Sequence, residues 1–173
     1  MREKTTSDHR RPIICIVDYG MGNTGSVANA FRYFGHAPRI TDQADALAEA
    51  DAIVLPGVGA FGQAMRNLQA LKLEAVLKEV VVERGKPFLG ICLGMQLIAE
   101  DSSEFGATRG LAWIRGHVRN IPEDDLFRVP HVGWSPVTFN DPGVFQRIDN
   151  GASFYFDHSL HLECDDKLVV GRA

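Results

Sequence analysis

A cysteine between two glycines, in the segment Gly90-Ile91-Cys92-Leu93-Gly94, is the part of the sequence with the clearest chemistry. The residues around it predict a strand over 88–91 and a helix over 93–100. A strand, a nucleophile and a helix in this order are typical of a nucleophile elbow, a sharp turn that exposes a reactive side chain. The thiol would lie at a helix N-terminus, where partial positive charge favours the thiolate. The amide of Leu93 would then point toward a developing oxyanion.

A second glycine loop, Pro56-Gly57-Val58-Gly59-Ala60-Phe61, follows a predicted strand over 52–55. Ligands of parallel sheets bind at the carboxyl ends of the strands, so this loop and the elbow should open onto one crevice. Its glycines would let backbone amides approach a substrate and supply the other oxyanion donor. The alternative is an ordinary turn. A phosphate loop is excluded, because the G-x-x-x-x-G-K-[ST] pattern is absent.

The first hundred residues alternate between strand and helix patterns, which predicts right-handed crossovers and a mostly parallel sheet. The helix that starts near Thr24 has Thr24 and Ser26 as candidate caps. The clearest helix pattern is one apolar stripe that ends at Gly85. The predicted strands are 13–18, 37–40, 52–55 and 88–91, and the predicted helices are 24–34, 44–50, 72–84 and 93–100.

The pattern changes after Gly106, where turn residues separate longer strand-like runs. These runs predict antiparallel strands that are added to the same sheet, at 113–121, 132–139, 153–164 and 167–173. No linker divides the two halves, so a single domain over 12–173 is expected. Residues 1–11 are polar and charged and are interpreted as a disordered tail.

Composition excludes several classes of protein. The formal net charge of −4 gives no reason to expect nucleic acid or an anionic membrane as a partner. No apolar run reaches the roughly 20 residues that a membrane span needs. Cys15, Cys92 and Cys164 form no CxxC pair, which suits neither a disulfide framework nor a zinc site. A cytoplasmic protein without a metal or cofactor is therefore expected, with Cys15 in the core and Cys164 either structural or half-exposed.

Five motifs in the same order resemble the class I glutamine amidotransferases, and in particular the glutaminase subunits of imidazole glycerol phosphate synthases. They are Asp18-Tyr19-Gly20-Met21-Gly22-Asn23, Leu55-Pro56-Gly57-Val58-Gly59-Ala60-Phe61, Gly90-Ile91-Cys92-Leu93-Gly94-Met95-Gln96, His131-Val132-Gly133-Trp134 and His158-Ser159. The resemblance implies a flavodoxin-like, three-layer α/β/α fold. It also implies a heterodimer with a (β/α)8-barrel cyclase/synthase subunit, which would use the ammonia in histidine biosynthesis.

The same resemblance implies a role for individual residues. Cys92 would attack the side-chain carboxamide of glutamine and form a glutamyl thioester. The implied oxyanion donors are Val58 or Gly59 and Leu93; the implied glutamine-binding residues are Gly57, Gln96, Ser159 and Leu160; the implied partner-facing residues are Tyr19, Gly20, Asn23, His131 and Trp134.

The sequence departs from the family pattern in one respect. The family continues with a His-Pro-Glu motif that supplies the base for the cysteine, and this motif does not occur here. The domain is therefore expected to be incomplete at its C-terminus: a fragment, a truncated product with impaired activity, or a subunit retained for partner binding. His161 and Glu163 have the same spacing and would share one face of a strand. However, they directly follow the segment that the resemblance assigns to glutamine binding.

Three other functions fit part of the pattern. A paralogous amidotransferase could supply ammonia to a sugar in surface-polysaccharide synthesis, with the same motifs and a different partner. A stand-alone cysteine hydrolase or stress protein could share the elbow, although the 56–61 loop and Met95-Gln96 argue against it. A non-catalytic binding subunit would fit the absence of the His-Pro-Glu motif.

Overall fold

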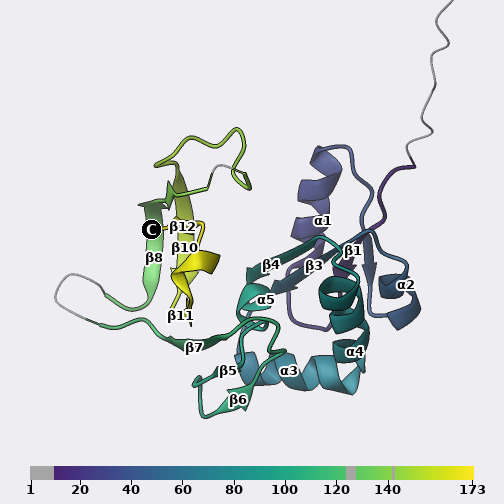
Figure 1. The fold of residues 1–173 in the computed structure, drawn as a ribbon, viewed down its shortest axis with the longest axis horizontal. Helices are drawn as coiled ribbons and strands as arrows, with labels where there is room; N and C mark the ends of the chain where they lie inside the picture. The colour runs from purple at the N-terminus through teal and green to yellow at the C-terminus, as the bar shows by residue number, and fades with distance from the viewer. Residues whose placement is uncertain (1–9, 124–127, 142) are drawn as a thin grey trace, which may run out of the picture. The chain divides into compact units, whose positions relative to one another are not determined.

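The computed structural model describes residues 10–123, 128–141 and 143–173 (Figure 1). Its contacts divide the chain into two compact units. The first unit comprises the residues up to Gly59 together with Arg66–Met95, and the second comprises Ala60–Met65 together with Gln96–Ala173. Residues 1–9 of the predicted tail lie outside the described ranges, and the single domain over 12–173 stays a prediction.

The first unit is built on a four-stranded parallel sheet with the order β2-β1-β3-β4. The strands are β1 (Ile14–Val17), β2 (Arg39–Thr41), β3 (Ala52–Gly57) and β4 (Phe88–Cys92). All four were predicted, and the parallel pairing is confirmed. β1 and β3 lie in the middle of the sheet and their side chains are almost all buried, which explains their continuous apolar sequence.

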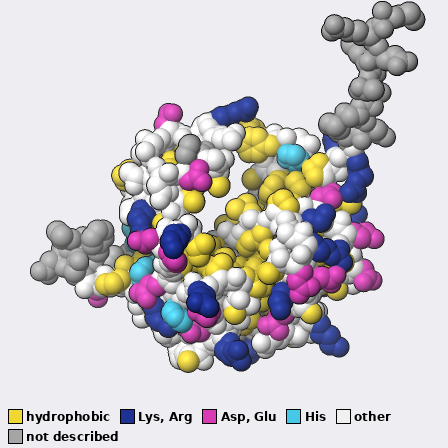
Figure 2. Space-filling model, viewed as in Figure 1, with side chains coloured by type: hydrophobic (Ala, Val, Ile, Leu, Met, Phe, Trp, Pro, Cys, Tyr) yellow, Lys and Arg dark blue, Asp and Glu magenta, His cyan; other side chains and the backbone are white. Residues whose placement is uncertain are grey.

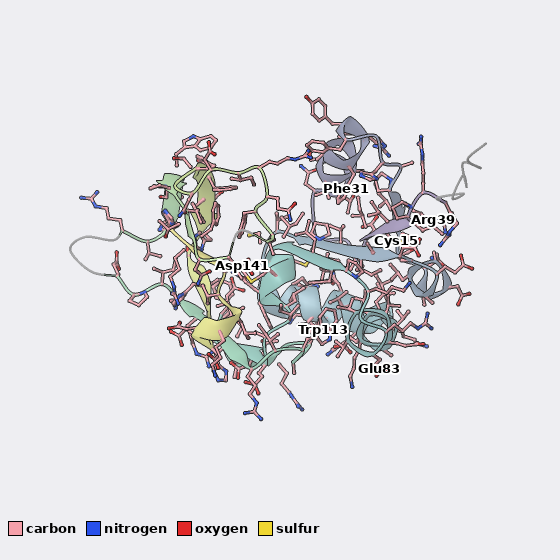
Figure 3. The ribbon with its side chains drawn as sticks, turned by 45° about the horizontal axis from the view of Figure 1, so that its top comes forward. Cys15, Phe31, Arg39, Glu83, Trp113 and Asp141 are labelled. Carbon is pink, nitrogen blue, oxygen red and sulfur yellow. The ribbon has the colours of Figure 1, made fainter. Side chains whose placement is uncertain are left out.

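Helices cover both faces of this sheet. On one face, Ile14, Ile16 and Val54 pack with Ala28 and Phe31 of α1 (Thr24–Tyr33). On the other face, the Cys15 thiol lies 3.5 Å from the Ala46 carbonyl oxygen of α2 (Ala44–Ala48). Figures 1 and 3 show α1 on one side of the sheet and α4 on the other. The predicted three-layer arrangement and the core position of Cys15 are confirmed.

The helices of the first unit follow the sequence pattern closely, with two differences. The predicted 72–84 helix is α4 (Leu73–Lys78), which continues as a π-helical segment, Glu79–Glu83. The cap of α1 is neither Thr24 nor Ser26. It is Asn23, whose side-chain oxygen accepts a hydrogen bond from the Ser26 amide at 3.1 Å. An asparagine before the first helical residue satisfies an amide that the helix itself leaves unpaired.

Helix α3 (Phe61–Ala70) was not predicted, and it contributes residues to both units. Its buried side chains are Phe61, Ala64, Met65 and Leu68. Their spacing of i, i+3, i+4 and i+7 is the usual signal of an amphipathic helix. The glycines directly before Phe61 predict a turn, and the helical spacing that begins at Phe61 is easily missed beside them.

The antiparallel strands of the second unit do not extend the parallel sheet, which corrects the expectation of one common sheet. They form three small sheets with the orders β11-β7-β5-β6, β10-β8 and β12-β9. The strands are β5 (Asp101–Ser102), β6 (Thr108–Arg109), β7 (Gly116–Asn120), β8 (His131–Pro136), β9 (Thr138–Phe139), β10 (Ser153–His158), β11 (Leu160–Cys164) and β12 (Gly171–Arg172). Within the described residues, these strands pair with one another and not with β4.

The predicted strand over 153–164 is interrupted at Ser159, which separates β10 from β11. β10 pairs with β8, whereas β11 pairs with β7. The chain thus changes sheets at this residue. The predicted strand over 167–173 is wrong in its first half, where Asp166–Leu168 forms a 3-10 turn before β12. The Asp165 side chain caps this turn by accepting from the Lys167 amide at 3.0 Å.

Basic and acidic side chains are interspersed on the face of the molecule drawn in Figure 2, consistent with the small net charge. The longest helices in the described ranges, α1 and α3, have ten residues each. A membrane-spanning helix needs about twice that length, so none of the helices described could cross a bilayer.

Candidate active site

The elbow has the geometry that the sequence predicts. Cys92 is the last residue of β4, and Leu93 is the first residue of α5 (Leu93–Gln96). The backbone of Cys92 has a φ of +51°, a left-handed conformation that costs free energy for a residue with a side chain. The strained turn leaves Cys92 exposed while Leu93 is buried. The Cys92 thiol is thus presented at the carboxyl end of the parallel sheet.

Glycines allow the backbones around this turn to approach each other. A Cβ on Gly94 would overlap the carbonyl oxygen of Leu55, and a Cβ on Gly90 would lie 2.6 Å from the Cα of Met95. Real Cβ atoms essentially never come within 3.0 Å of such an atom. The two glycines of the elbow are therefore required by packing on either side of Cys92.

The second glycine loop lies beside the elbow. Gly57, the last residue of β3, pairs directly with Cys92 in the parallel register. A Cβ on Gly57 would lie 2.5 Å from the Tyr19 hydroxyl oxygen and 2.9 Å from the Leu93 Cβ. Val58 and Gly59 follow, and Gly59 has a φ of +103°. The first unit therefore brings together Cys92 and the predicted residues Gly57, Val58, Gly59 and Leu93.

Helix α5 is shorter than predicted, because it ends at Gln96 rather than near Glu100. The carbonyl groups of the residues after Gln96 accept hydrogen bonds from the segment 111–113 instead of continuing the helix. The Leu97 carbonyl accepts from the Leu111 amide at 2.8 Å, and the Ile98 carbonyl accepts from the Trp113 amide at 2.9 Å. A four-residue helix has a smaller dipole than the expected eight-residue one. Its contribution to stabilising a thiolate is correspondingly smaller.

The other predicted glutamine-binding residues belong to the second unit. Gln96 is buried, and its side-chain amide donates to the Leu160 carbonyl oxygen at 3.3 Å. The Ser159 carbonyl accepts from the Ile121 amide at 2.9 Å, at the point where the chain passes from β10 to β11. The structure therefore joins Gln96 to Leu160 directly, and Ser159 is the residue before Leu160 in the chain.

The five predicted partner-facing residues differ in exposure. Trp134 is 72% exposed, and Gly20 is exposed in the turn after β1. Asn23 caps α1, and His131 is half-buried on β8. Tyr19 is only 2% exposed, so its side chain faces the interior of the first unit rather than solvent. Its hydroxyl has no hydrogen-bond partner among the described residues. Burial, and secondly the neighbouring Cys92 thiol, raises the pKa of this hydroxyl.

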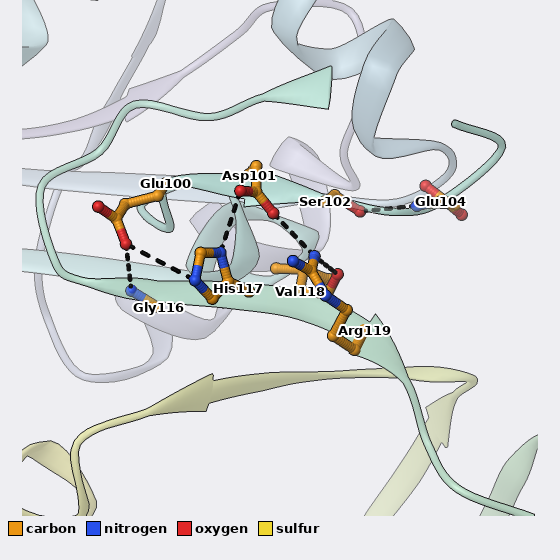
Figure 4. A network of polar contacts seen from close by, with 8 residues as sticks. All are labelled: Glu100, Asp101, Ser102, Glu104, Gly116, His117, Val118 and Arg119. Carbon is orange, nitrogen blue, oxygen red and sulfur yellow. Dashed lines mark hydrogen bonds and ion pairs between the residues drawn. The ribbon is translucent and has the colours of Figure 1, made fainter. Parts of the chain in front are cut away.

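His161 and Glu163 lie on a charged face of the second unit. The register pairs Asp101 with His117, His117 with Glu163, and Arg119 with His161, so these side chains share one face of their sheet. His117 Nδ1 is 3.0 Å from Asp101 Oδ2, and the Arg119 guanidinium donates to Asp101 Oδ1 at 2.8 Å (Figure 4).

His161 Nε2 lies 3.5 Å from Glu163 Oε1, in the range of an ion pair, and it has no hydrogen-bond partner among the described residues. The predicted sharing of one face by these two residues is confirmed. His117 and His131 lie on β7 and β8. The charged face itself was not predicted. Its signal was the alternation of polar and apolar residues in 116–120.

Comparison with known proteins identifies the class to which this fold and elbow belong. The family model "Glutamine amidotransferase class-I" matches residues 15–169. A solved structure described as a glutamine amidotransferase superposes with a TM-score of 0.73 at 14% identity, covering 93% of this chain and 80% of that one. PurLQS from Thermotoga maritima gives 0.65 at 21% identity, covering 94% and 74%. The chain belongs to the class I glutamine amidotransferase family.

Curated relatives narrow the family to subunits named imidazole glycerol phosphate synthase subunit HisH. The one from Syntrophotalea carbinolica is 44% identical over 165 residues, covering 91% of this chain and 79% of the relative. HisH 1 from Campylobacter jejuni is 42% identical, covering 93% and 81%. HisH from Listeria monocytogenes is 39% identical, covering 91% and 76%. Within its family, the chain is HisH-like.

Proposed function

We propose that this chain is a glutaminase subunit that delivers ammonia to the cyclase/synthase subunit of an imidazole glycerol phosphate synthase. The observation that carries the proposal is the pairing of Gly57 with Cys92 at the ends of adjacent parallel strands. This pairing sets an exposed cysteine, with a strained left-handed backbone, beside a glycine loop whose amides would donate to a substrate oxygen. The names of the HisH relatives support the choice of acceptor reaction.

In the proposed reaction, the Cys92 sulfur attacks the carboxamide carbon of glutamine. The amides of Leu93 and of Val58 or Gly59 donate to the oxyanion that forms. The carbon–nitrogen bond then breaks, and the nitrogen takes a proton and leaves as ammonia. Water next attacks the thioester, the carbon–sulfur bond breaks, and glutamate is released with the thiol restored. Gly57, Gln96, Ser159 and Leu160 hold the amino-acid end of glutamine.

A base must carry the proton from the thiol to the leaving nitrogen. The printed sequence contains no His-Pro-Glu motif, and His161 with Glu163 is the His-x-Glu pair that it offers. Their distance of 3.5 Å suits an ion pair in which the carboxylate orients the imidazole. We keep this pair as the candidate base and orienting group to be tested by substitution.

An aromatic face of the second unit supports the proposed partner. Trp134 and Tyr155 lie on neighbouring strands, with ring centroids 5.7 Å apart, and they are 72% and 57% exposed. Val132 is exposed on the same side of β8. Exposed aromatic residues of this kind are typical anchors of protein interfaces. The barrel subunit would dock here and form the heterodimer. The three free cysteines suit a reducing compartment, so we place this assembly in the cytoplasm.

The first test examines the glutamine site independently of the base. The chain is incubated with an electrophilic diazoketone analogue of L-glutamine, and labelled cysteines are located by peptide mass. Labelling of Cys92 that saturates with the analogue and is blocked by L-glutamine, but not by D-glutamine, is expected. Labelling that does not saturate, or that L-glutamine leaves unchanged, would contradict the assigned site.

The second test measures turnover. Release of glutamate from glutamine is followed with a cognate cyclase subunit, using the chain, Cys92→Ala and His161→Ala. The Cys92→Ala variant is expected to lose all activity and to keep its affinity for the cyclase. A loss of more than about 100-fold in His161→Ala would assign the base, since general bases contribute about that much or more. Activity that persists in Cys92→Ala would remove the nucleophile from the proposal.

A further inference from the structure

A chain of polar side chains crosses the less exposed face of the two-stranded sheet formed by β8 and β10. His131 lies directly opposite His158 in the antiparallel register. His131 Nδ1 is 3.2 Å from His158 Nε2, and His131 Nε2 is 2.8 Å from the hydroxyl oxygen of Ser135. The other nitrogen of His158, Nδ1, is 2.8 Å from the Leu160 carbonyl oxygen. Three side chains and one backbone carbonyl thus form a continuous series.

The acceptor at one end determines where the protons lie in the neutral rings. A carbonyl oxygen can only accept, so His158 Nδ1 must donate to Leu160. His158 Nε2 is then bare and accepts from His131 Nδ1. His131 Nε2 is bare in turn and accepts from the Ser135 hydroxyl. Ser135 therefore favours the tautomer of His131 that donates to His158. His158 in turn keeps the tautomer that donates to the Leu160 carbonyl.

The Leu160 carbonyl is also the point at which this series meets the candidate glutamine site. It accepts a second hydrogen bond, from the Gln96 side-chain amide at 3.3 Å. A carbonyl oxygen has two lone pairs, so both of its acceptor positions are occupied. Gln96 and Leu160 are two of the four residues proposed to hold the amino-acid end of glutamine. A hydrogen bond that holds the Leu160 carbonyl in place therefore also holds the Gln96 side chain.

We propose that His158 is a positioning residue for glutamine, acting through the Leu160 carbonyl and Gln96, with His131 and Ser135 holding its ring in the donating tautomer. This inference rests on the proposed function. Its consequence is specific: loss of the hydrogen bond to Leu160 weakens the binding of glutamine and leaves the attack by Cys92 almost unchanged. A role in packing alone would not distinguish the two nitrogens of the ring.

Packing is kept by other contacts. The His131 ring stacks on Phe156 with centroids 4.8 Å apart, and Phe156 lies 5.6 Å from the His158 ring. These apolar contacts depend on ring shape and burial, not on which nitrogen carries a proton. The role of the hydrogen bond can therefore be tested by amide side chains, which place a donor at one ring position or at the other.

The experiment compares His158→Asn with His158→Gln in the full chain. An asparagine amide reaches the position of Nδ1, whereas a glutamine amide reaches that of Nε2. Labelling of Cys92 by the diazoketone analogue of L-glutamine yields a half-saturating concentration and a limiting rate. For His158→Gln, the half-saturating concentration should rise about tenfold, the effect of one hydrogen bond, with the limiting rate within about twofold. His158→Asn should stay within about threefold of wild type in both.

Iodoacetamide, which alkylates a thiol without using the glutamine site, is the matched control reagent. Its rate at Cys92 should be the same in wild type and in both variants. Equal half-saturating concentrations in wild type and His158→Gln, or an equal rise in His158→Asn and His158→Gln, would overturn the inference. If wild type itself fails to saturate, the proposed function fails, which is a different result.

Ser135→Ala provides a second measurement that removes one oxygen atom and leaves both rings in place. Without the Ser135 donor, His131 can carry its proton on Nε2, and the series loses its preferred direction. The half-saturating concentration should rise about two- to threefold, again with an unchanged limiting rate. A wild-type value in folded Ser135→Ala would remove His131 and Ser135 from the proposal, and a fall in the limiting rate alone would contradict it.

Discussion

The two units of the molecule use the same kinds of residue in different ways. In the first unit, β1 is buried along its whole length and β3 along almost all of it. In the second unit, β8 and β10 alternate between half-buried and exposed side chains. The first pattern is that of a parallel sheet covered on both faces, and the second is that of a strand pair with one face in solvent. The first unit therefore holds the strained turn at Cys92, and the second exposes large side chains such as Trp134.

The predicted site residues are distributed over the two units. Cys92, Leu93 and the loop that starts at Gly57 belong to the first unit, where parallel pairing of β3 and β4 fixes their backbones. Gln96, Leu160 and the His131–His158 series belong to the second, where the proposed contacts are to glutamine and to a partner. The position of Cys92 thus depends on close backbone packing, whereas Gln96 and Leu160 are joined by a side-chain hydrogen bond that a single substitution can remove.

The largest effect is expected for Gly94→Ala, which tests the dependence of the elbow on close backbone packing. The new Cβ would overlap the Leu55 carbonyl oxygen, a backbone atom of the adjacent central strand that cannot move without displacing the sheet. The free energy of unfolding should fall by about 3 kcal/mol or more. Gly25→Ala is the matched control, since no atom lies within 4 Å of its added Cβ. Urea unfolding of both variants measures the difference, and equal stabilities would refute the packing argument.

A second pair of substitutions compares the two units directly. Ile16→Ala opens a cavity in the fully buried strand β1 and should cost about 3 kcal/mol of unfolding free energy. Trp134→Ala removes a side chain that is 72% exposed and should change stability by about 0.5 kcal/mol or less. Its affinity for the cyclase subunit should instead fall at least about tenfold. Unfolding curves and calorimetric titration check the two effects, and unchanged affinity in Trp134→Ala would remove this face from the interface.

Sequence patterns predicted the first unit well because its signals are local. Continuous apolar runs predicted the strands of the parallel sheet, and the 72–84 stripe predicted α4 with its continuation. The elbow was predicted for the same reason, since its five residues contain the strand end, the nucleophile and the helix start. In each case the residues that decide the structure are neighbours in the chain.

The second unit was predicted less well because its structure depends on which strands pair. The apolar content of 153–164 indicates a strand, but nothing in that run reveals that Ser159 ends one sheet and Leu160 begins another. The length of α5 likewise depends on Leu111 and Trp113, which take the carbonyls that would have continued the helix. The contact between His131 and His158 joins residues of two motifs whose register only the structure provides.

Tyr19→Phe is expected to have a smaller effect, and of opposite sign. The Tyr19 hydroxyl is buried beside Gly57 and has no hydrogen-bond partner among the described residues. Removing an unpaired buried hydroxyl while keeping the ring should raise the free energy of unfolding by about 1 kcal/mol. The same variant in the labelling assay shows whether this hydroxyl contributes to the site. A loss of stability in urea unfolding would mean that the Tyr19 hydroxyl has a hydrogen-bond partner in solution. The first unit would then not carry the free-energy cost of an unpaired buried hydroxyl.

The smallest effect concerns two carboxylates, one in each unit, whose pKa values are both lowered for different reasons. A hydrogen bond from the Ile13 amide is the largest cause for Asp51, ahead of the nearby Arg10 and Lys86. For Asp101 it is the hydrogen bond from the Arg119 side chain, ahead of His117. A folded pKa below the unfolded value of 3.8 means that each carboxylate stabilises the protein above that pH. The contribution is lost as the pH falls from 3.8 through the lower folded pKa.

A high salt concentration should change the pKa values of Asp51 and Asp101 by different amounts. The Ile13 amide is a backbone donor fixed at the start of β1, and its 2.8 Å hydrogen bond to Asp51 does not depend on a mobile charge. Arg119 and His117 are side chains on a half-exposed face, and their attraction to Asp101 is screened by ions. Titration of the carboxyl carbon shifts by NMR should give midpoints below 3.8 for both groups at low salt. At about 1 M salt, where the screening length is roughly 3 Å, the Asp101 midpoint should move back toward its ordinary value while that of Asp51 changes little. An equal movement of both midpoints would mean that Arg10 and Lys86, rather than the Ile13 amide, lower the pKa of Asp51. The difference between backbone contacts in the first unit and side-chain contacts in the second would then not apply to these two carboxylates.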